Sequence, residues 1–235
     1  MNSLVTYQLK NGIATITMDD GKANAFSPLM QAELNAALDQ ALADDAIVIL
    51  AGRVGMFCAG FDLPTLMGGG DSAVKMLTGG FMIAEKLLSF PKPVIIACTG
   101  HALAMGVFLV MCGDYCIGAE GAFKIGANEV AIGLTMPRTA IEICRARLAP
   151  AHFNRAMMTS EIYKPADAVA AGFLDKVVEI SDVLTEAHAI ASKYWKLNMA
   201  AYKATKMLVR EQMLKALRTA IEADDVSFRT LYKIP

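Results

Sequence analysis

The sequence predicts an α/β domain whose core is followed by a helical C-terminal region. Short apolar runs typical of strands alternate with helical patterns up to Pro137, and helical patterns dominate after it. The chain has 235 residues, of which 55% are hydrophobic and 19% are charged, so it can bury a sizeable core and is not disordered. We therefore expect one domain over residues 1–235, with a core at about 1–195 and a helical extension at about 196–235.

The first half of the chain contains most of the predicted strands. Residues 5–9 and 13–18 flank Asn11-Gly12, and Asn-Gly between two extended runs is a strong signal for a β-hairpin. Ser27 followed by Pro28 predicts a capped helix that runs to about residue 43. The next predicted elements are a strand at 47–51, a glycine-punctuated loop at 52–62, a helix at about 73–88, a strand at 94–98 and a turn at Gly100.

The second half is predominantly helical. A helix of small residues is predicted to begin near Met105, and two further strands are predicted at 115–117 and 122–125. After Pro137 the predicted helices lie at about 138–148, 151–159, 165–171, 182–195 and from 199 onward.

The charge pattern indicates which partners the chain does not bind. Its formal net charge is −1, and no basic stripe is present, so we expect no nucleic-acid partner. A cluster of Lys196, Lys203, Lys206 and Arg210 is interpreted as a solvated helix face. The most apolar runs are shorter than the roughly 20 residues of a membrane span. The apolar surplus should therefore be buried inside the subunit or between subunits.

The cysteines show no pattern of a disulfide framework or a metal site. No two of them form a C-x-x-C pair, and no histidine stands at metal-ligand spacing beside them. Residues 1–10 lack the features of a secretory or transit segment. We therefore expect reduced thiols, a cytoplasmic location and no metal. The five residues are Cys58, Cys98, Cys112, Cys116 and Cys144.

Two segments place small residues directly after a predicted strand, where a ligand can approach the backbone. They are Phe57-Cys58-Ala59-Gly60-Phe61-Asp62-Leu63 and Gly100-His101-Ala102-Leu103-Ala104-Met105-Gly106, and the second opens a helix. The first N–H groups of a helix have no partner within it. Two such groups from separate loops can stabilise a developing oxyanion.

Five segments together resemble the crotonase (enoyl-CoA hydratase/isomerase) superfamily. The segments 57–63 and 99–114 are similar to its two oxyanion loops, and Ile125-Gly126-Ala127-Asn128-Glu129 is similar to its catalytic-glutamate segment. Lys22-Ala23-Asn24-Ala25-Phe26 resembles its early CoA-binding loop, and 165–175 resembles the helix and turn that follow the core. The similarity runs in order from residue 5 to about residue 210.

The resemblance implies a crotonase-like spiral of ββα units that assembles as a homotrimer or a dimer of trimers. It implies an acyl-CoA thioester as substrate, with coenzyme A as part of that substrate and no separate cofactor. The oxyanion donors would be the backbone N–H groups of Phe61 and Met105, although the family more often has glycine where Met105 stands. The residues implied in substrate binding are Lys22, Ala23, Ala59, Gly60, Asp62, Leu63, Leu66, Gly106 and Phe108.

Within this set, the residues are expected to play different parts. Lys22 and Ala23 would lie near the CoA nucleotide, and the 59–63 segment would lie along the acyl-thioester path. The Asp62 carboxylate is expected to hold its loop as a turn cap. The apolar lining would come from Phe61, Leu66, Met67 and Phe108.

The pairing of Glu129 with Phe108 indicates the reaction. Hydratases of the family use two glutamates, and here the position of one of them, on the helix of the second oxyanion loop, is Phe108. The mitochondrial-type Δ3,Δ2-enoyl-CoA isomerases have an apolar residue there and a single glutamate in a sequence close to Ile125–Glu129. One carboxylate suffices to move a proton between two carbons. We therefore expect an isomerase with Glu129 as its proton-transfer group.

Other functions remain open from the sequence. A hydratase could supply its second acid from elsewhere in the chain, and a protein with this fold could bind coenzyme A as a non-catalytic scaffold. Family chains commonly continue through a last helical segment that covers a pocket, whereas this sequence ends at Pro235. We expect that cover to be shortened or to come from a neighbouring subunit.

Overall fold

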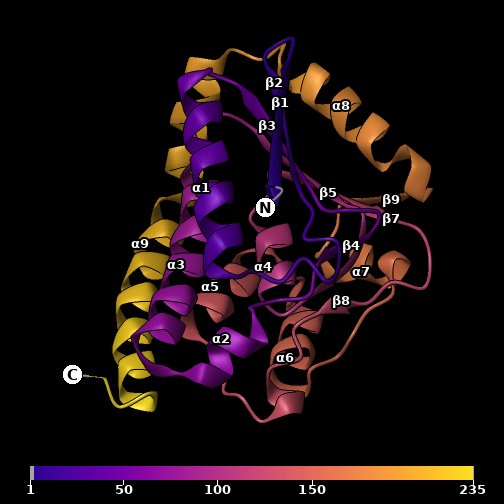
Figure 1. The fold of residues 1–235 in the computed structure, drawn as a ribbon. Helices are drawn as coiled ribbons and strands as arrows, with labels where there is room; N and C mark the ends of the chain where they lie inside the picture. Colours follow the sequence, from indigo (N-terminus) through magenta and orange to yellow (C-terminus); the bar gives the residue numbers. More distant parts are fainter. Residues whose placement is uncertain (1–2, 235) are drawn as a thin grey trace.

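Two β-sheets with helices packed outside them form the structure, a computed structural model that describes residues 3–234 (Figure 1). The larger sheet has the order β1-β2-β3-β5-β7-β9, and the smaller has the order β4-β6-β8. Only the β1–β2 hairpin is antiparallel among the named strand pairs of these residues. The strands are β1 (Val5–Lys10), β2 (Ile13–Met18), β3 (Ile47–Ala51), β4 (Gly55–Cys58), β5 (Val94–Cys98), β6 (Gly100–Leu103), β7 (Tyr115–Ala119), β8 (Ile125–Gly126) and β9 (Lys176–Val178).

From β3 to β8 the chain follows a repeating pattern of two strands and a helical segment. Each repeat places its first strand, β3, β5 or β7, in the larger sheet and its second, β4, β6 or β8, in the smaller one. The helices are α1 (Pro28–Ala43), α2 (Leu63–Gly68), α3 (Gly70–Ser89), α4 (Met105–Met111), α5 (Arg138–Arg147), α6 (Pro150–Thr159), α7 (Pro165–Ala171), α8 (Val183–Tyr194) and α9 (Met199–Leu231), with short 3₁₀ turns η1 (Val130–Ile132) and η2 (Ile180–Asp182). This arrangement confirms the predicted spiral of ββα units with a helical C-terminal region.

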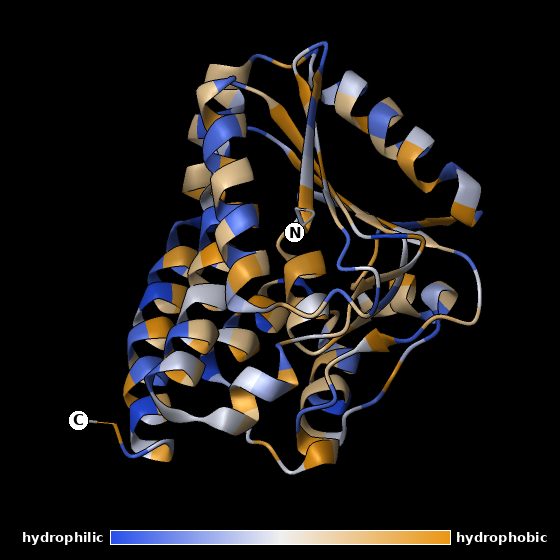
Figure 2. Cartoon of the chain, in the orientation of Figure 1, coloured by the Kyte–Doolittle hydropathy of each residue, from blue (hydrophilic) through white to orange (hydrophobic). Residues whose placement is uncertain are grey.

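Both faces of the larger sheet are covered, which explains why its central strands are continuous apolar runs. On β3, Val48 and Leu50 belong to the core that contains α1, α3 and α4. The alternate residues Ile47 and Ile49 pack with α8 on the opposite face. Figure 2 shows these strands as hydrophobic segments enclosed by helices whose outer faces are more polar. No helix within residues 3–234 is long and apolar enough to cross a bilayer.

The sequence predicted the long elements correctly and missed the short ones. The hairpin, the α1 helix, the central strands and the C-terminal helices lie where they were expected. The predicted loop at 52–62 contains β4, the predicted turn at Gly100 begins β6, and α2 and β9 were not predicted. Of the strand predicted at 122–125, only residue 125 is in β8. These strands have two to four residues, and their partners lie far away in the sequence.

A buried cluster of charges attaches the C-terminal helix to the core, and it corrects one sequence interpretation. Lys206 Nζ lies 2.7 Å from Asp114 Oδ2, and Arg210 Nη2 lies 2.9 Å from Asp114 Oδ1. Lys206 is only 7% exposed, so these two residues do not form the solvated face that was expected, whereas Lys196 and Lys203 are exposed. Residues four apart share one face of a helix, and here that face meets the start of β7.

Farther along α9, Asp224 holds a second helix in place. Its buried carboxylate accepts hydrogen bonds from the Arg138 N–H (3.0 Å), the Thr139 N–H (2.8 Å) and the Thr139 hydroxyl (2.8 Å). These N–H groups begin α5 and have no partner inside that helix. The Tyr232 hydroxyl, just beyond α9, donates to the Leu66 carbonyl in α2. The chain's own last helix therefore reaches the segment after the first oxyanion loop, where a shortened cover or a neighbour's segment was expected.

Replacing Asp224 with alanine should destabilise the protein by roughly 3 kcal/mol, because three donors at the start of α5, two of them in buried bonds, lose their acceptor. Asp225→Ala is the matched control, since the neighbouring carboxylate makes partly exposed bonds to Thr78 and Arg229 and should cost less than about 1 kcal/mol. Urea unfolding of both variants measures the difference. Equal losses would show that the cap does not hold α5.

Candidate active site

The smaller sheet brings three loops to one edge of the molecule. Its strands β4, β6 and β8 are parallel, so their carboxyl ends lie on the same side. The Ala102 N–H donates to the Lys124 carbonyl (3.0 Å), and the Ala104 N–H donates to the Gly126 carbonyl (3.2 Å). The first oxyanion loop, the second oxyanion loop and the Glu129 segment, all expected from the sequence to form the site, therefore meet at this edge.

The two oxyanion loops contact each other at Gly60. A Cβ atom at Gly60 would lie 2.8 Å from the Ala104 Cβ and 3.6 Å from the Met105 nitrogen, and its φ is +107°. Only glycine fits this position without strain or clash. Within residues 3–234, neither the Phe61 N–H nor the Met105 N–H donates to another protein group. Two free donors on adjacent loops are the arrangement that can stabilise an oxyanion.

The backbone around Met105 is held by close packing. A Cβ atom at Gly106 would lie 2.1 Å from the Cys58 carbonyl oxygen, so this glycine lets α4 pack directly on the first loop. Ala104 precedes the helix with a φ of +49°, a conformation that L-residues rarely adopt. Gly106, which was expected to contact substrate, is thus placed where it sets the distance between the two loops.

The predicted CoA-binding loop lies beside the first oxyanion loop. The Ala59 N–H donates to the Ala23 carbonyl (3.1 Å), and the Phe26 N–H donates to the Gly60 carbonyl (2.8 Å). The Asp20 carboxylate accepts the N–H groups of Lys22, Asn24 and Ala25 and so fixes the curve of this loop. Lys22 is exposed at its tip. Its ammonium is therefore free to meet an anionic group of a ligand that reaches the 59–60 backbone.

The residues after the first oxyanion loop have different roles. Asp62 Oδ2 accepts the Thr65 N–H (3.0 Å) and the Thr65 hydroxyl (2.7 Å), so its carboxylate caps α2. Leu66 is half-buried, whereas Leu63 is 59% exposed and Met67 is 85% exposed. The expectation that Met67 contributes to an apolar lining is wrong for this chain, because α2 directs that side chain outward.

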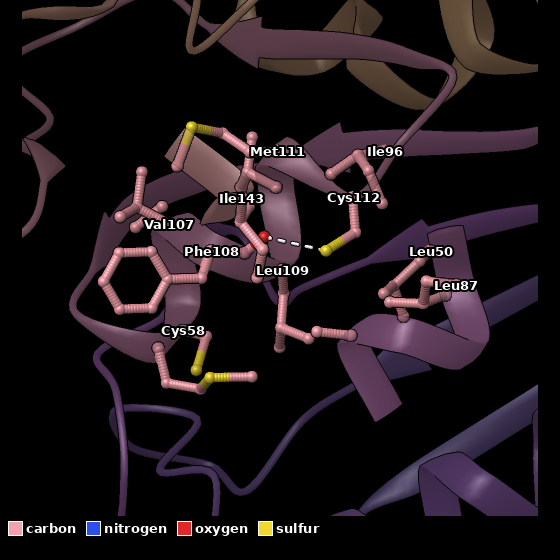
Figure 3. Packing of buried hydrophobic residues seen from close by; sticks show 14 of the residues in the cluster. Leu50, Cys58, Leu87, Ile96, Val107, Phe108, Leu109, Met111, Cys112 and Ile143 are labelled. Atoms are coloured by element: carbon pink, nitrogen blue, oxygen red, sulfur yellow. Dashed lines mark hydrogen bonds between the residues drawn. The ribbon is translucent and has the colours of Figure 1, made fainter. Parts of the chain in front are cut away.

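Phe108 lies in the apolar core rather than at a polar surface. It is 1% exposed, and its ring centroid lies 6.4 Å from that of Phe81, which in turn lies 6.0 Å from Phe61. Figure 3 shows Phe108 on α4 among other buried side chains, with the Cys112 thiol bonded back to the Phe108 carbonyl. The Phe61 ring packs against Gly80 of α3. The Phe108 ring therefore contributes neither an acid nor a base to the interior beside α4, whose ionisable side chains include the buried thiols of Cys58 and Cys112.

Glu129 is the buried carboxylate of the site. It stands at the start of η1, is 7% exposed, and its Oε2 has no hydrogen-bond partner within residues 3–234. Burial raises the pKa of Glu129 to about 7, and the backbone N–H groups of Glu129 and Asn128 partly oppose that rise. No second carboxylate contributes to this shift in the described part of the chain. Glu129 is thus a single proton acceptor poised near neutral pH.

Three other titratable side chains, Glu85, Glu120 and His101, have structural partners or lie in solvent. Glu85 pairs with Arg218 at 2.7 Å, and Glu120 is exposed. His101 Nδ1 accepts a hydrogen bond from the Lys124 N–H (2.9 Å). The imidazole therefore connects β6 to the loop before β8. In residues 3–234 no three His, Cys, Asp or Glu side chains are grouped to hold a metal ion.

One neighbour of Glu129 was not found from the sequence. The segment after α6 pairs with β8, since Ile125 and Tyr163 exchange two backbone hydrogen bonds of 3.0 and 2.9 Å. These residues are 38 positions apart in the printed sequence, and neither carries a local signal for pairing. Only the path of the chain brings them together.

Comparisons with known proteins agree with this geometry. A sequence profile described as enoyl-CoA hydratase/isomerase matches residues 8–233. A probable enoyl-CoA hydratase from Rhizobium meliloti is 27% identical over 233 residues, which cover 97% of this chain and 89% of that protein.

Solved structures give the same result at higher identity. An enoyl-CoA hydratase/isomerase family protein from Pseudomonas syringae is 45% identical, with a TM-score of 0.93 and coverage of 94% of this chain and 96% of that chain. A protein from Mycobacterium tuberculosis, described in one solved structure as an enoyl-CoA isomerase and in another as a probable enoyl-CoA hydratase, is 44% identical in both. The first has a TM-score of 0.91 and coverage of 94% and 97%, and the second has a TM-score of 0.93 and coverage of 96% of each chain. The profile match over nearly the whole chain, together with the ββα spiral, shows that the chain belongs to the enoyl-CoA hydratase/isomerase family of acyl-CoA enzymes, within the crotonase superfamily.

Proposed function

We propose that this protein moves a double bond from 3-enoyl-CoA to 2-enoyl-CoA, with Glu129 transferring the proton. The observation that carries the proposal is the single buried carboxylate, whose Oε2 is unpaired, in a site where Phe108 replaces the second glutamate of the hydratases. One description of the relative from Mycobacterium tuberculosis, as an enoyl-CoA isomerase, supports it, whereas the other description of that relative, as a probable enoyl-CoA hydratase, favours the second candidate below. Coenzyme A enters as part of the substrate, and the reaction needs no further cofactor.

The proposed mechanism uses one group twice. The Glu129 carboxylate removes a proton from C2 of the 3-enoyl thioester, and the electron pair moves onto the thioester oxygen to give a dienolate. The N–H groups of Phe61 and Met105 stabilise that oxyanion. The protonated Glu129 then delivers the proton to C4, which leaves a double bond between C2 and C3 and restores the carboxylate. Water is not consumed, and the apolar Phe108 helps to exclude it.

The raised pKa suits this double role. A carboxyl group with a pKa of about 7 is a stronger base than an ordinary glutamate and a stronger acid than water near neutral pH. Glu129 can therefore act as the base at C2 in its ionised form and as the acid at C4 once it holds the proton.

Hydration of 2-trans-enoyl-CoA is the second candidate. Relatives described as enoyl-CoA hydratases, such as the one from Rhizobium meliloti, favour it. It requires a second group that activates or positions water beside Glu129, and the described residues place no carboxylate there. A scaffold that binds coenzyme A thioesters without turnover is the third candidate.

The deciding experiment supplies 3-enoyl-CoA and 2-trans-enoyl-CoA separately and follows the products by mass. We expect 3-enoyl-CoA to become 2-enoyl-CoA with no change in mass, and 2-trans-enoyl-CoA to gain no water. Glu129→Gln should lower the isomerisation rate by at least about a thousandfold, because the proton acceptor is lost. Glu120→Gln, an exposed loop carboxylate, is the control and should retain full rate. Rapid water addition would instead identify a hydratase, and binding without turnover of either substrate would identify a scaffold.

Burial of Glu129 should also appear in the pH dependence of stability. The folded-state pKa is raised from 4.5 to about 7, so the folded protein holds the proton more tightly and loses stability as pH rises between these values. The shift corresponds to roughly 3 kcal/mol. Relative to the wild type, Glu129→Gln should therefore gain stability by up to that amount between pH 5 and pH 8, as measured by urea unfolding. Parallel pH curves for the two proteins would contradict the buried, unpaired state of the carboxylate.

We also propose that the chain assembles as a homotrimer or a dimer of trimers. Several large apolar side chains next to the site are exposed in the single chain, and burial against a second copy would remove them from water. They are Val130, Ile132, Leu134 and Met158.

Light scattering should therefore give a mass three or six times that of one chain. Ile132→Asp should shift it toward the monomer if this patch lies in the interface, while Val54→Asp, another exposed apolar residue in the loop before β4, should not. A monomeric wild-type protein would contradict the proposed assembly.

A further inference from the structure

The turn that carries Glu129 receives a hydrogen bond from another helix. Ser160 follows α6 directly, and its Oγ accepts the Ala131 N–H at 3.0 Å. Ala131 is the second residue of η1, two positions after Glu129. The first N–H groups of a helical turn have no partner within the turn. Ser160 therefore satisfies, from a distant part of the chain, a donor that the Glu129 turn cannot satisfy itself.

Ser160 occupies a backbone conformation that favours glycine. Its φ is 54° and its ψ is 37°, and it is only 9% exposed. A buried serine in the left-handed region costs free energy that glycine would not. The hydroxyl is the one polar group that serine adds over glycine here, and it accepts the Ala131 N–H. The hydrogen bond to Ala131 therefore explains why a serine occupies a position where glycine would be less strained.

Residues 160–163 also contact the chain on the N-terminal side of Glu129. Ile125 is bonded to Tyr163 on both sides of the backbone, and a Cβ atom at Gly126 would lie 3.0 Å from the Glu161 carbonyl oxygen. Residues 160–163 therefore contact the chain before Glu129 at Ile125 and after it at Ala131. Between these two attachments the carboxylate is presented on a segment fixed at both ends.

We propose that Ser160 is a positioning residue for the proton transfer, acting by locking the η1 turn so that the Glu129 carboxylate keeps its buried orientation. This rests on the proposed role of Glu129. Without the Ser160 hydroxyl, the Ala131 N–H loses its bond to the segment after α6, and because Ala131 is exposed, water can replace the hydroxyl without holding the turn in place. A small displacement of a catalytic group has a large effect on rate, because proton transfer depends on the distance and direction between the reacting atoms.

The test compares three substitutions at this position. Ser160→Ala removes the hydroxyl and keeps the strained φ, Ser160→Gly removes the hydroxyl and relaxes the strain, and Ser160→Asn keeps a hydrogen-bond acceptor in a residue that tolerates positive φ. We expect kcat for isomerisation to fall about tenfold or more in the alanine and glycine variants, with KM changed less than about twofold, and to recover in the asparagine variant. Thr159→Ala is the neighbouring control, since that hydroxyl bonds only within α6, and it should leave kcat unchanged.

Two measurements need no turnover and therefore separate this proposal from the proposed function. Hydrogen exchange at the Ala131 amide should be slow in the wild type and fast in Ser160→Ala. The carboxyl carbon of Glu129, assigned by its loss in Glu129→Gln and followed by NMR over pH, should titrate closer to an ordinary glutamate in Ser160→Ala, because the open turn admits water. Both effects would support positioning even if the wild type proved to catalyse another acyl-CoA reaction.

Other outcomes would overturn the proposal. Fast exchange at Ala131 with an unchanged kcat and an unchanged Glu129 titration would mean that the hydrogen bond is only structural. Full activity in Ser160→Gly would show that the hydroxyl is dispensable. Failure of all three variants to fold, tested by circular dichroism, would assign Ser160 to the stability of α6 and not to the orientation of Glu129.

Discussion

The close approach of Gly60 to Ala104 is the constraint on which the site depends. The two loops belong to successive ββα units, and they meet only because β4 and β6 are parallel neighbours in the smaller sheet. With no side chain at Gly60, the Met105 N–H can lie beside the first loop. The repeated path of the chain, with one strand in each sheet, is what sets this distance. The backbone donors are thus a property of the fold more than of any particular side chain.

Unlike the backbone donors, the buried Glu129 carboxylate lowers the free energy of unfolding, and other interactions must compensate for this loss. A buried carboxylate with an unpaired oxygen reduces stability, and its raised pKa reports that penalty. Two buried polar clusters elsewhere in the fold offset this loss of stability. Asp224 of α9 caps α5, and the Asp114 cluster fastens α9 to the start of β7. The C-terminal helix therefore supports the helix behind the site, although it contributes no reacting group.

Sequence reasoning located the parts of this site whose signals are local and missed those that depend on the path of the chain. The Asn11-Gly12 turn and the central apolar strands are defined by neighbours in sequence. In contrast, β4 and β6 pair with each other across more than forty residues of sequence. The sequence analysis therefore predicted a loop where β4 lies and a turn where β6 begins. Lys206 was interpreted as solvated because its partner Asp114, which lies just before β7, is distant in the sequence. Ser160 gave no signal at all, since its acceptor role exists only once α6 and η1 are adjacent.

In the proposed function, the side chain at position 108 selects between the reactions that this backbone arrangement can support. The oxyanion donors are backbone groups, so a methionine at position 105 leaves them in place. A carboxylate at position 108 would differ, because it would be buried in the apolar core beside the ring of Phe81. Two carboxylates that share a dry site repel each other, so Phe108→Glu would favour a state in which one of the two carboxyl groups holds a proton. Proton shuttling between two carbons needs neither water nor a second acid, and an apolar ring at this position favours it.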